Sequence, residues 1–143
     1  DLMTKNKIVV NNPSIWRPIL ALKDAVSAYL RALQADYSIS GTFNIAYDNY
    51  TVGSVADIVK ESVETLTDKQ VSIDIQNVQD VRNYKVTSEK AKTTLGFHPR
   101  HSVYDIANEL VSNWYLFEKD IDDDKYYNIN ICKKVFKNKL RIE

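Results

Sequence analysis

The sequence predicts a small α/β domain in which short strands alternate with amphipathic helices. Three observations carry this prediction: a β-branched run at 7–11, apolar residues spaced by three and four from residue 22 onward, and strict apolar–polar alternation over 71–75. The chain has 143 residues, a length typical of one domain with a core of its own.

Two extended segments open the chain. The run 7–11 is rich in β-branched residues and ends at an Asn-Pro pair, which is typical of a strand followed by a turn. Residues 16–20 form the second extended segment. Within it, Pro18 lacks a backbone donor and biases Arg17 toward an extended conformation.

The period then changes to that of a helix over 22–35. The apolar residues that recur at helical spacing are Leu22, Val26, Tyr29, Leu30 and Leu33. Asp24 falls in the first turn, where a carboxylate complements the helix dipole. An amphipathic helix is expected here.

A second strand–helix unit follows. We predict a strand over 42–46 after Gly41, a polar turn over 47–50, and a helix capped by Thr51 or Ser54. The apolar stripe of that helix comprises Val55, Ile58, Val59, Val63 and Leu66. The alternating segment 71–75 then predicts the next strand.

The sequence of the last third of the chain predicts two helices followed by a tail. Ser88 is placed to cap a short helix that ends at Gly96 in the left-handed conformation. The final helix is expected from Ser102 to Phe117. The tail, 120–143, carries an acidic run and then a basic run, with alternation that suggests one short strand near Ile129.

Composition excludes several function classes. Lys plus Arg and Asp plus Glu both number 19, so the basic excess typical of a duplex-coating nucleic-acid binder is missing. The 3 glycines are isolated, and they make neither a dinucleotide-binding turn nor a phosphate-binding loop. The 1 cysteine cannot form an internal disulfide, which favours a reducing compartment. With no apolar run of about 20 residues, we expect a cytoplasmic protein without a membrane partner.

Two arginines are the best candidates for binding chemistry. Arg17 lies between an aromatic residue and a proline, and Arg82 lies in an irregular stretch with Asp80 and Tyr84. Guanidinium is the preferred bidentate partner of phosphate, so two arginines on opposed loops could clamp a diphosphate. On spacing alone, the simpler interpretation is that each is a surface arginine paired with a nearby aspartate.

Other candidates are weaker. His98 and His101 have a spacing compatible with metal ligation, but no third ligand is evident and a proline separates them, so we predict no metal site. Tyr115 and Lys119 match the spacing of a catalytic Tyr-x-x-x-Lys, which we interpret as a surface pair at the end of a helix. We predict no catalytic residue in this chain.

The order of the motifs resembles the extended short-chain dehydrogenase/reductases, the NAD-dependent nucleotide-sugar epimerases and dehydratases. The resemblance spans roughly residues 5–117, in the order and spacing of that family. It rests on Trp16-Arg-Pro-Ile-Leu-Ala-Leu-Lys-Asp24-Ala-Val, Gly41-Thr-Phe-Asn-Ile-Ala46, Asp80-Val-Arg-Asn-Tyr84, Ser88-Glu-Lys90, Leu95-Gly-Phe97 and Ser102-Val-Tyr-Asp-Ile106. Ala21 departs from the histidine often found at its position.

This resemblance implies a fold and a site. The chain would be the C-terminal, substrate-binding part of a Rossmann-type enzyme, without the dinucleotide-binding half and its catalytic tyrosine. Arg17 and Arg82 match the arginines that bind the diphosphate of the nucleotide sugar, which favours binding over the simpler interpretation. Asp24 and Asn44 match residues whose roles we take as structural. NAD or NADP would bind the full-length parent, and we expect neither to bind this chain alone.

The resulting expectations are specific. We predict a substrate-binding region at 1–119 and a charged tail at 120–143. The isolated chain is expected to be inactive, and the sequence leaves open whether the parent is an epimerase, a dehydratase or a reductase. The alternative is a stand-alone, non-enzymatic interaction or regulatory domain on the same scaffold. We further expect apolar surface at 43–45 and on the last helix to drive homo-oligomer formation.

Overall fold

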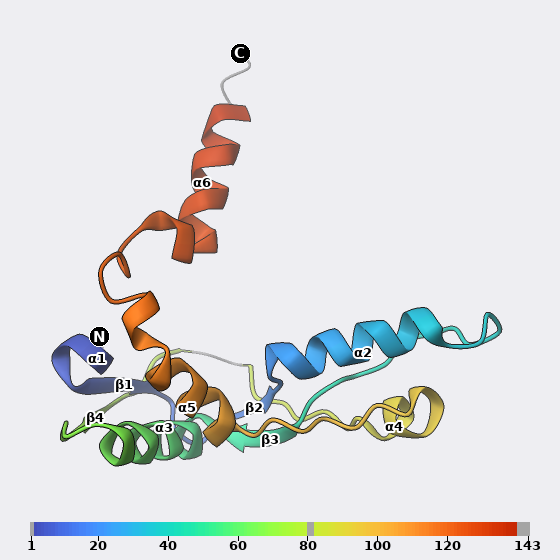
Figure 1. Ribbon diagram of the computed structural model, residues 1–143, viewed down its shortest axis with the longest axis horizontal. Coiled ribbons are helices and arrows are strands. Elements are labelled where there is room, and N and C mark those ends of the chain that lie inside the picture. Colours follow the sequence, from blue (N-terminus) through green and yellow to red (C-terminus); the bar gives the residue numbers. More distant parts are fainter. Residues whose placement is uncertain (1, 80–81, 140–143) are drawn as a thin grey trace. The chain divides into compact units, whose positions relative to one another are not determined.

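The computed structural model describes residues 2–79 and 82–139, with the side chains of 137–139 excepted. The chain divides into two compact units, residues 1–111 and residues 112–143. Each unit is described by itself. Figure 1 labels the elements in chain order.

The first unit contains the predicted alternation of strands and helices. Its elements are α1 (Leu2–Lys5), β1 (Lys7–Asn11), β2 (Trp16–Ile19), α2 (Leu22–Gln34), β3 (Asp48–Thr51), α3 (Val52–Leu66), β4 (Ser72–Gln76), α4 (Glu89–Leu95) and α5 (Val103–Ser112). Among the described residues, the strands form two small sheets. β1 pairs with β4 in parallel, and β2 pairs with β3 antiparallel, with Arg17 opposite Tyr50.

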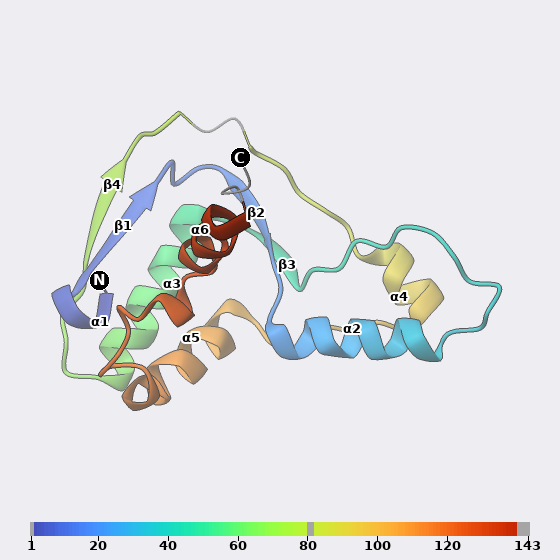
Figure 2. The ribbon, with the colours of Figure 1, turned by 90° about the horizontal axis from the view of Figure 1, so that it is seen from above.

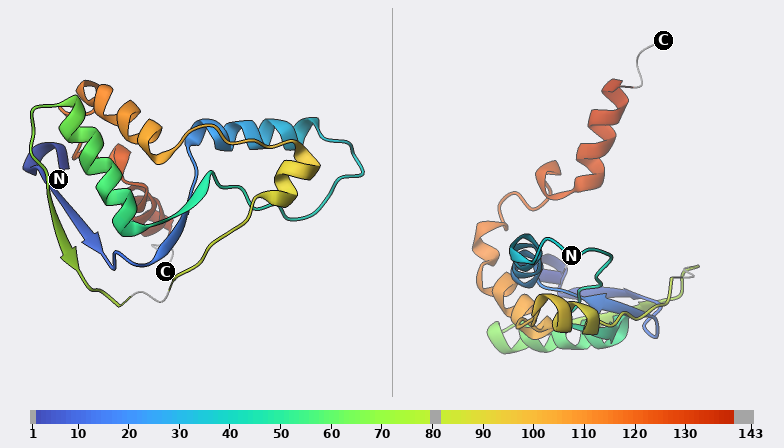
Figure 3. Two further views of the ribbon diagram at one scale, coloured as in Figure 1. Left: turned by 90° about the horizontal axis from the view of Figure 1, so that it is seen from below. Right: turned by 90° about the vertical axis from the view of Figure 1, so that its right-hand side faces the viewer.

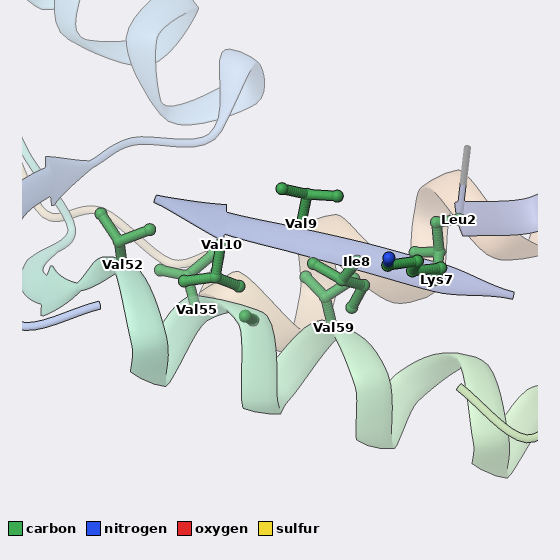
Figure 4. Close-up of a pocket in the computed structure, with 9 residues that line it drawn as sticks. Leu2, Lys7, Ile8, Val9, Val10, Val52, Val55 and Val59 are labelled. Atoms are coloured by element: carbon green, nitrogen blue, oxygen red, sulfur yellow. The ribbon is translucent and has the colours of Figure 1, made fainter. Parts of the chain in front are cut away.

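Helix α3 covers one face of the parallel sheet, as Figure 2 shows. Val10 of β1 and Val63 of α3 are fully buried, because the apolar stripe predicted for α3 faces the strands. Beside them, an apolar groove of about 400 Å³ runs between β1 and α3. Its lining includes Ile8, Val55 and Val59, which Figure 4 shows between the strand and the helix.

A second core lies between α2 and α4. Phe97 is completely buried against Ala28 and Ala91, and Phe43 and Ile45 are partly buried against the same cluster. The chain reaches Phe97 through Gly96, whose φ of 62° is the left-handed helix end that the sequence predicts. The contact between α2 and α4 therefore depends on small residues that let one phenyl ring fill the space.

The strand predicted at 42–46 is wrong. These residues do not pair with another strand, and β3 instead occupies Asp48–Thr51, where a turn was expected. The reason is that segment 42–46 is held by side chains: the Ser88 hydroxyl bonds to both the N–H and the C=O of Ala46, at 2.8 and 3.1 Å. Ladder pairing begins only at Tyr47, whose N–H donates to Ile19 O at 2.7 Å.

Of the predicted helix caps, that of α3 is confirmed and that of α4 is wrong. Ser88 precedes α4, but its hydroxyl serves Ala46 and makes no cap hydrogen bond. Thr51 caps α3 by accepting from Ser54 N at 3.0 Å, so the choice between Thr51 and Ser54 is decided in favour of Thr51. α5 begins as predicted, because Ser102 and Asp105 exchange side chain-to-backbone hydrogen bonds.

The second unit contains no strand among its described residues, contrary to the short strand suggested for the tail. Its elements are the 3₁₀ helices η1 (Trp114–Leu116) and η2 (Asp124–Tyr126) and the α-helix α6 (Asn128–Lys139). The predicted final helix also ends earlier, since α5 stops at Ser112 and η1 follows. Figure 3 gives two further views of the ribbon.

Apolar surface is exposed on the last helix, as predicted, but the apolar residues of 43–45 are partly buried. Phe43 and Ile45 are partly buried in the core, whereas the large residues of α2 face outward, led by Leu22 and Leu33 at 81% and 83% exposure. Leu110 on α5 is also exposed. No helix within the described part of the chain is both long and apolar enough to cross a membrane.

Candidate functional site

The candidate site forms where residues 82–86 run beside β2. The backbone N–H of Trp16 donates to the side-chain carbonyl of Asn83 at 2.9 Å. On the other strand of this sheet, the Asn49 amide exchanges two hydrogen bonds with the backbone of Val86, at 2.8 and 2.9 Å. Two asparagine side chains therefore hold an irregular segment in position beside the sheet.

This arrangement brings the side chain of Arg17 against the backbone of Arg82. One guanidinium nitrogen of Arg17 donates to the backbone carbonyl of Arg82 and, at 2.8 Å, to that of Trp16. The guanidinium carbon lies 5.6 Å from the centre of the Tyr84 ring. The Arg17 side chain is thus held by two carbonyls and an aromatic ring. These contacts fix the position of the guanidinium before any ligand binds.

Trp16 and Lys85 form a second cation–aromatic pair. The Lys85 ammonium lies 3.4 Å from the centre of the Trp16 ring. Residues 16 and 17 project to opposite faces of a strand, so the Trp16–Lys85 pair and the Arg17–Tyr84 pair lie on different faces of β2. Trp16 and Lys85 are not among the residues predicted from the sequence. The available signal was that Trp16 precedes Arg17 and that Lys85 follows Arg82 by three residues.

Tyr50 lies across the antiparallel ladder from Arg17, on the same face of the sheet. Burial raises the pKa of the Tyr50 phenol, and the neighbouring Tyr47 and Asp48 raise it further. The phenol therefore stays protonated at neutral pH and can act as a hydrogen-bond donor. The Arg17 guanidinium and the phenol of its cross-strand neighbour are both hydrogen-bond donors suited to the oxygens of a phosphate ester.

Asp24 is the centre of a separate polar cluster. It is only 3% exposed, and one carboxylate oxygen accepts from the backbone N–H groups of Arg100 and His101, at 3.0 and 2.9 Å. The other oxygen lies 2.9 Å from Nδ1 of His101. The structural role inferred for Asp24 therefore extends beyond the helix dipole, because the carboxylate connects α2 to the chain that leads into α5.

The pKa of Asp24 reflects two opposing effects. Burial raises the pKa of this carboxyl, but hydrogen bonds from the His101 backbone, the His101 ring and the Arg100 backbone, together with the charge of His101, outweigh it. The net pKa lies below its ordinary value of 3.8. Asp24 is therefore ionised at neutral pH, which suits an acceptor for several donors and does not suit an acid catalyst.

The two histidines and the Tyr115–Lys119 pair lie outside the site formed by β2 and residues 82–86. His101 uses Nδ1 toward Asp24, and His98 is exposed. Within the residues that the structure describes, no three His, Cys, Asp or Glu side chains are grouped as a metal site would require. Tyr115 lies in η1 and Lys119 in the turn after it; both are exposed as predicted, but the α-helix expected to carry them is wrong.

The junction of β3 with α3 does not have the form of a dinucleotide-binding turn. A dinucleotide places its pyrophosphate at a glycine-containing helix N-terminus that follows a strand. The junction of β3 with α3 has this order and contains Gly53, but its N–H groups are already used: Val52 N donates to Ile15 O and Gly53 N donates to Pro13 O. A Cβ on Gly53 would lie 3.1 Å from Pro13, so this glycine permits close packing of a loop.

Comparison by sequence yields no relative. No protein-family model matches the chain, and no curated protein matches it. Comparison by structure, in contrast, yields many solved chains with a similar fold.

Three of these structures represent the group. A UDP-glucose-4-epimerase from Stenotrophomonas maltophila, with bound NAD and formylated UDP-arabinopyranose, is 18% identical, and the match covers 79% of this chain and 36% of that chain at a TM-score of 0.67. The ADP-L-glycero-D-manno-heptose-6-epimerase of Helicobacter pylori is 15% identical, with coverages of 80% and 35% and a TM-score of 0.65. An L-threonine dehydrogenase from Phytophthora infestans is 11% identical, with coverages of 79% and 38% and a TM-score of 0.66.

These neighbours are epimerases and dehydrogenases of the extended short-chain dehydrogenase/reductase family. The chain spans between about a third and two fifths of their length. At such low identity the likeness is one of fold, and it confirms the predicted α/β architecture as part of that larger fold. The neighbours include enzymes named for nucleotide sugars and enzymes named for an amino acid, so the fold by itself does not select a substrate.

Proposed function

We propose that this chain is the nucleotide-sugar-binding part of an NAD- or NADP-dependent epimerase or dehydratase, and that Arg17 and Arg82 bind the diphosphate of the substrate. The observation that carries the proposal is the hydrogen bond from the Arg17 guanidinium to the Arg82 carbonyl. This bond places the Arg17 guanidinium against the backbone of residue 82, on a scaffold similar to that of the epimerases above.

The chemistry of the site supports a diphosphate. A planar guanidinium matches two phosphate oxygens at once. The Tyr50 phenol lies on the same face and stays protonated. Charge neutralisation by two guanidinium groups would offset the desolvation of the diphosphate, which is the main obstacle to its binding.

The role of this chain would be to bind and orient the substrate. A nicotinamide cofactor supplies hydride transfer in enzymes of this kind, and the described residues offer it no cradle, so the cofactor and the acid–base residues would come from the rest of a longer parent. The alternative is a stand-alone interaction domain that shares the scaffold.

Calorimetry with a panel of ligands tests the proposal. UDP-, dTDP-, CDP- and GDP-sugars, inorganic pyrophosphate and L-threonine are titrated into the chain and into a full-length parent. We expect at least one nucleotide sugar to bind and L-threonine not to bind. Arg17→Gln and Arg82→Gln should each weaken binding by about 10- to 100-fold, since a hydrogen bond to a charged group contributes about 1.5–3 kcal/mol.

The matched control is Arg100→Gln, which removes an exposed guanidinium while leaving the backbone N–H that Asp24 accepts. This variant should bind as the unmodified chain does. If no nucleotide sugar binds to either protein, the proposed function is wrong. If a nucleotide sugar binds equally well to the Arg17 and Arg82 variants, the function stands but the site assignment is wrong.

A further inference from the structure

The side chains of residues 83–85 alternate between two sides of their segment. The Asn83 side chain accepts from Trp16 N at 2.9 Å, and the Lys85 ammonium lies 3.4 Å from the centre of the Trp16 ring. Tyr84, which lies between them in the chain, contacts Arg17 instead. This is the alternation of an extended segment, and it directs the Tyr84 ring away from Trp16 and toward the guanidinium.

Hydrogen bonds on both sides of Tyr84 hold the backbone that carries it. The bond from Trp16 N fixes Asn83 on one side, and the Asn49 amide exchanges bonds of 2.8 and 2.9 Å with the backbone of Val86 on the other. The contact with the guanidinium constrains the ring itself. A ring that is already held in place loses little conformational freedom when a ligand stacks on it, which favours affinity.

The Tyr84 ring has surface available to a ligand. The guanidinium of Arg17 lies over one face, with its carbon 5.6 Å from the ring centre, and the Tyr84 side chain is 51% exposed. The Trp16 ring differs, because the Lys85 ammonium lies over it. Of these two rings, Tyr84 is therefore the one that adjoins the predicted phosphate-binding arginine and can accept a stacking partner.

We propose that the Tyr84 ring stacks on the nucleobase of a nucleoside diphosphate whose phosphates bind at Arg17, an inference that rests on the function proposed above. In such a ligand only the ribose separates the base from the diphosphate, so the base lies within one sugar of the guanidinium. A flat phenol ring matches the flat face of a base, and aromatic side chains and guanidinium planes both stack on bases. The sugar at the other end of the diphosphate is puckered and carries hydroxyl groups, so it matches the ring less well.

Stacking also limits what this contact can select. Every base has a π face, so an aromatic ring accepts purines and pyrimidines alike. Tyr84 should therefore favour ligands that carry a base over ligands that do not, without deciding which base is bound.

Calorimetry with and without a base tests this proposal. UDP, dTDP, CDP, GDP and inorganic pyrophosphate are titrated into the chain and into a full-length parent. For each nucleoside diphosphate that binds, Tyr84→Leu should weaken binding by about 5- to 150-fold, the range found when a base loses its aromatic partner. Pyrophosphate carries no base, so it should bind Tyr84→Leu as it binds the unmodified chain.

Two controls separate stacking from other roles of the side chain. Tyr84→Phe keeps the ring and should leave nucleotide binding unchanged. Tyr37→Leu makes the same replacement at an exposed tyrosine in the turn after α2, and it should also leave binding unchanged. Far-UV circular dichroism confirms that all three variants keep their helices.

Proton NMR of the bound nucleotide gives a readout specific to stacking. The ring current of a tyrosine shifts protons above its face upfield, so the base protons should shift upfield on binding. The shift should persist with Tyr84→Phe and disappear with Tyr84→Leu. A purely structural role of Tyr84 would not produce this pattern.

The possible results separate this inference from the proposed function. If Tyr84→Leu weakens pyrophosphate as much as the nucleotides, Tyr84 acts only by positioning Arg17, and base stacking is wrong. If nucleotides bind and Arg17→Gln weakens them while Tyr84→Leu does not, the proposed function stands and the base contact alone is wrong. If no nucleoside diphosphate and no nucleotide sugar binds either protein, both are wrong.

Discussion

Replacing Asp24 is the sharpest test of how the first unit is held together. Its carboxylate is 3% exposed and receives two backbone N–H groups and the ring nitrogen of His101. Asp24→Ala removes the acceptor for all three donors. Asp24→Asn keeps one oxygen for the two backbone N–H groups and loses the negative charge.

The expected losses follow from these bonds. A hydrogen bond to a charged group contributes about 1.5–3 kcal/mol, so two backbone bonds together contribute about 3–6 kcal/mol. Water can reach the half-exposed His101 and recover part of this, and we expect Asp24→Ala to lower the free energy of unfolding by about 3–4 kcal/mol. Asp24→Asn should lower it by about 1–2 kcal/mol, because neutral bonds replace charged ones.

The same carboxylate predicts a pH dependence. Because its pKa is lower in the folded chain than the ordinary value of 3.8, the folded state favours the ionised form. The stabilisation is therefore fully present above about pH 4 and is lost as the pH falls through the lower pKa of the folded chain. Asp24→Asn should lack this component of acid destabilisation.

Urea denaturation followed by far-UV circular dichroism, at pH 7 and again near pH 3, measures both effects. Asp57→Asn is the control, since Asp57 is exposed on α3 and its replacement should change stability by less than about 0.5 kcal/mol. If Asp24→Ala lowers stability by no more than this control, the carboxylate does not hold the segment at 100–101. If Asp24→Asn lowers the free energy of unfolding as much as Asp24→Ala does, the negative charge of Asp24 dominates its contribution to stability, and keeping an acceptor for the backbone N–H groups matters little.

Two further substitutions test the hydrogen bonds made by Ser88 and by Thr51. Ser88→Ala removes the hydroxyl that bonds to Ala46 N and O, and it should lower stability by about 1–2 kcal/mol and raise amide exchange at Ala46. Thr51→Val removes the cap of α3 and should lower stability by about 1 kcal/mol in the same urea assay. The exposed Thr65→Val is the control for Thr51, and an equal effect of both valine substitutions would refute the capping role.

Helices, strands and turns could be predicted where interactions between residues close together in the chain determine their conformation. The β-branched run of β1, the helical spacing of α2 and α3 and the left-handed Gly96 are each specified by neighbours along the chain, and the structure confirms them. The strand predicted at 42–46 is wrong, and at its end the backbone groups of Ala46 bond to the Ser88 hydroxyl, 42 residues away, in place of a strand. The tail has strand-like alternation near Ile129, but these residues form α6.

The candidate site was predictable only in part. A resemblance in motif order selected Arg17 and Arg82, since each lies in a recognisable local context. The side chains that hold them together come from separate segments: Asn83 bonds to the backbone of Trp16, and Asn49 bonds to that of Val86. Asparagine is common in loops, so no pattern along the chain distinguishes these two from any other.

The sequence alone determined the alternation of strands and helices and the identity of the two candidate arginines, because these depend on residues close together in the chain. Only the tertiary structure decided which face of each element is used. The periodicity of α2 predicts a helix with an apolar stripe, yet that stripe faces outward because the opposite side carries Asp24 and Ala28. The buried carboxylate of Asp24 needs the three hydrogen-bond donors that residues 100 and 101 provide. Losing these bonds would cost more free energy than leaving the leucines of α2 exposed, and this orients the helix.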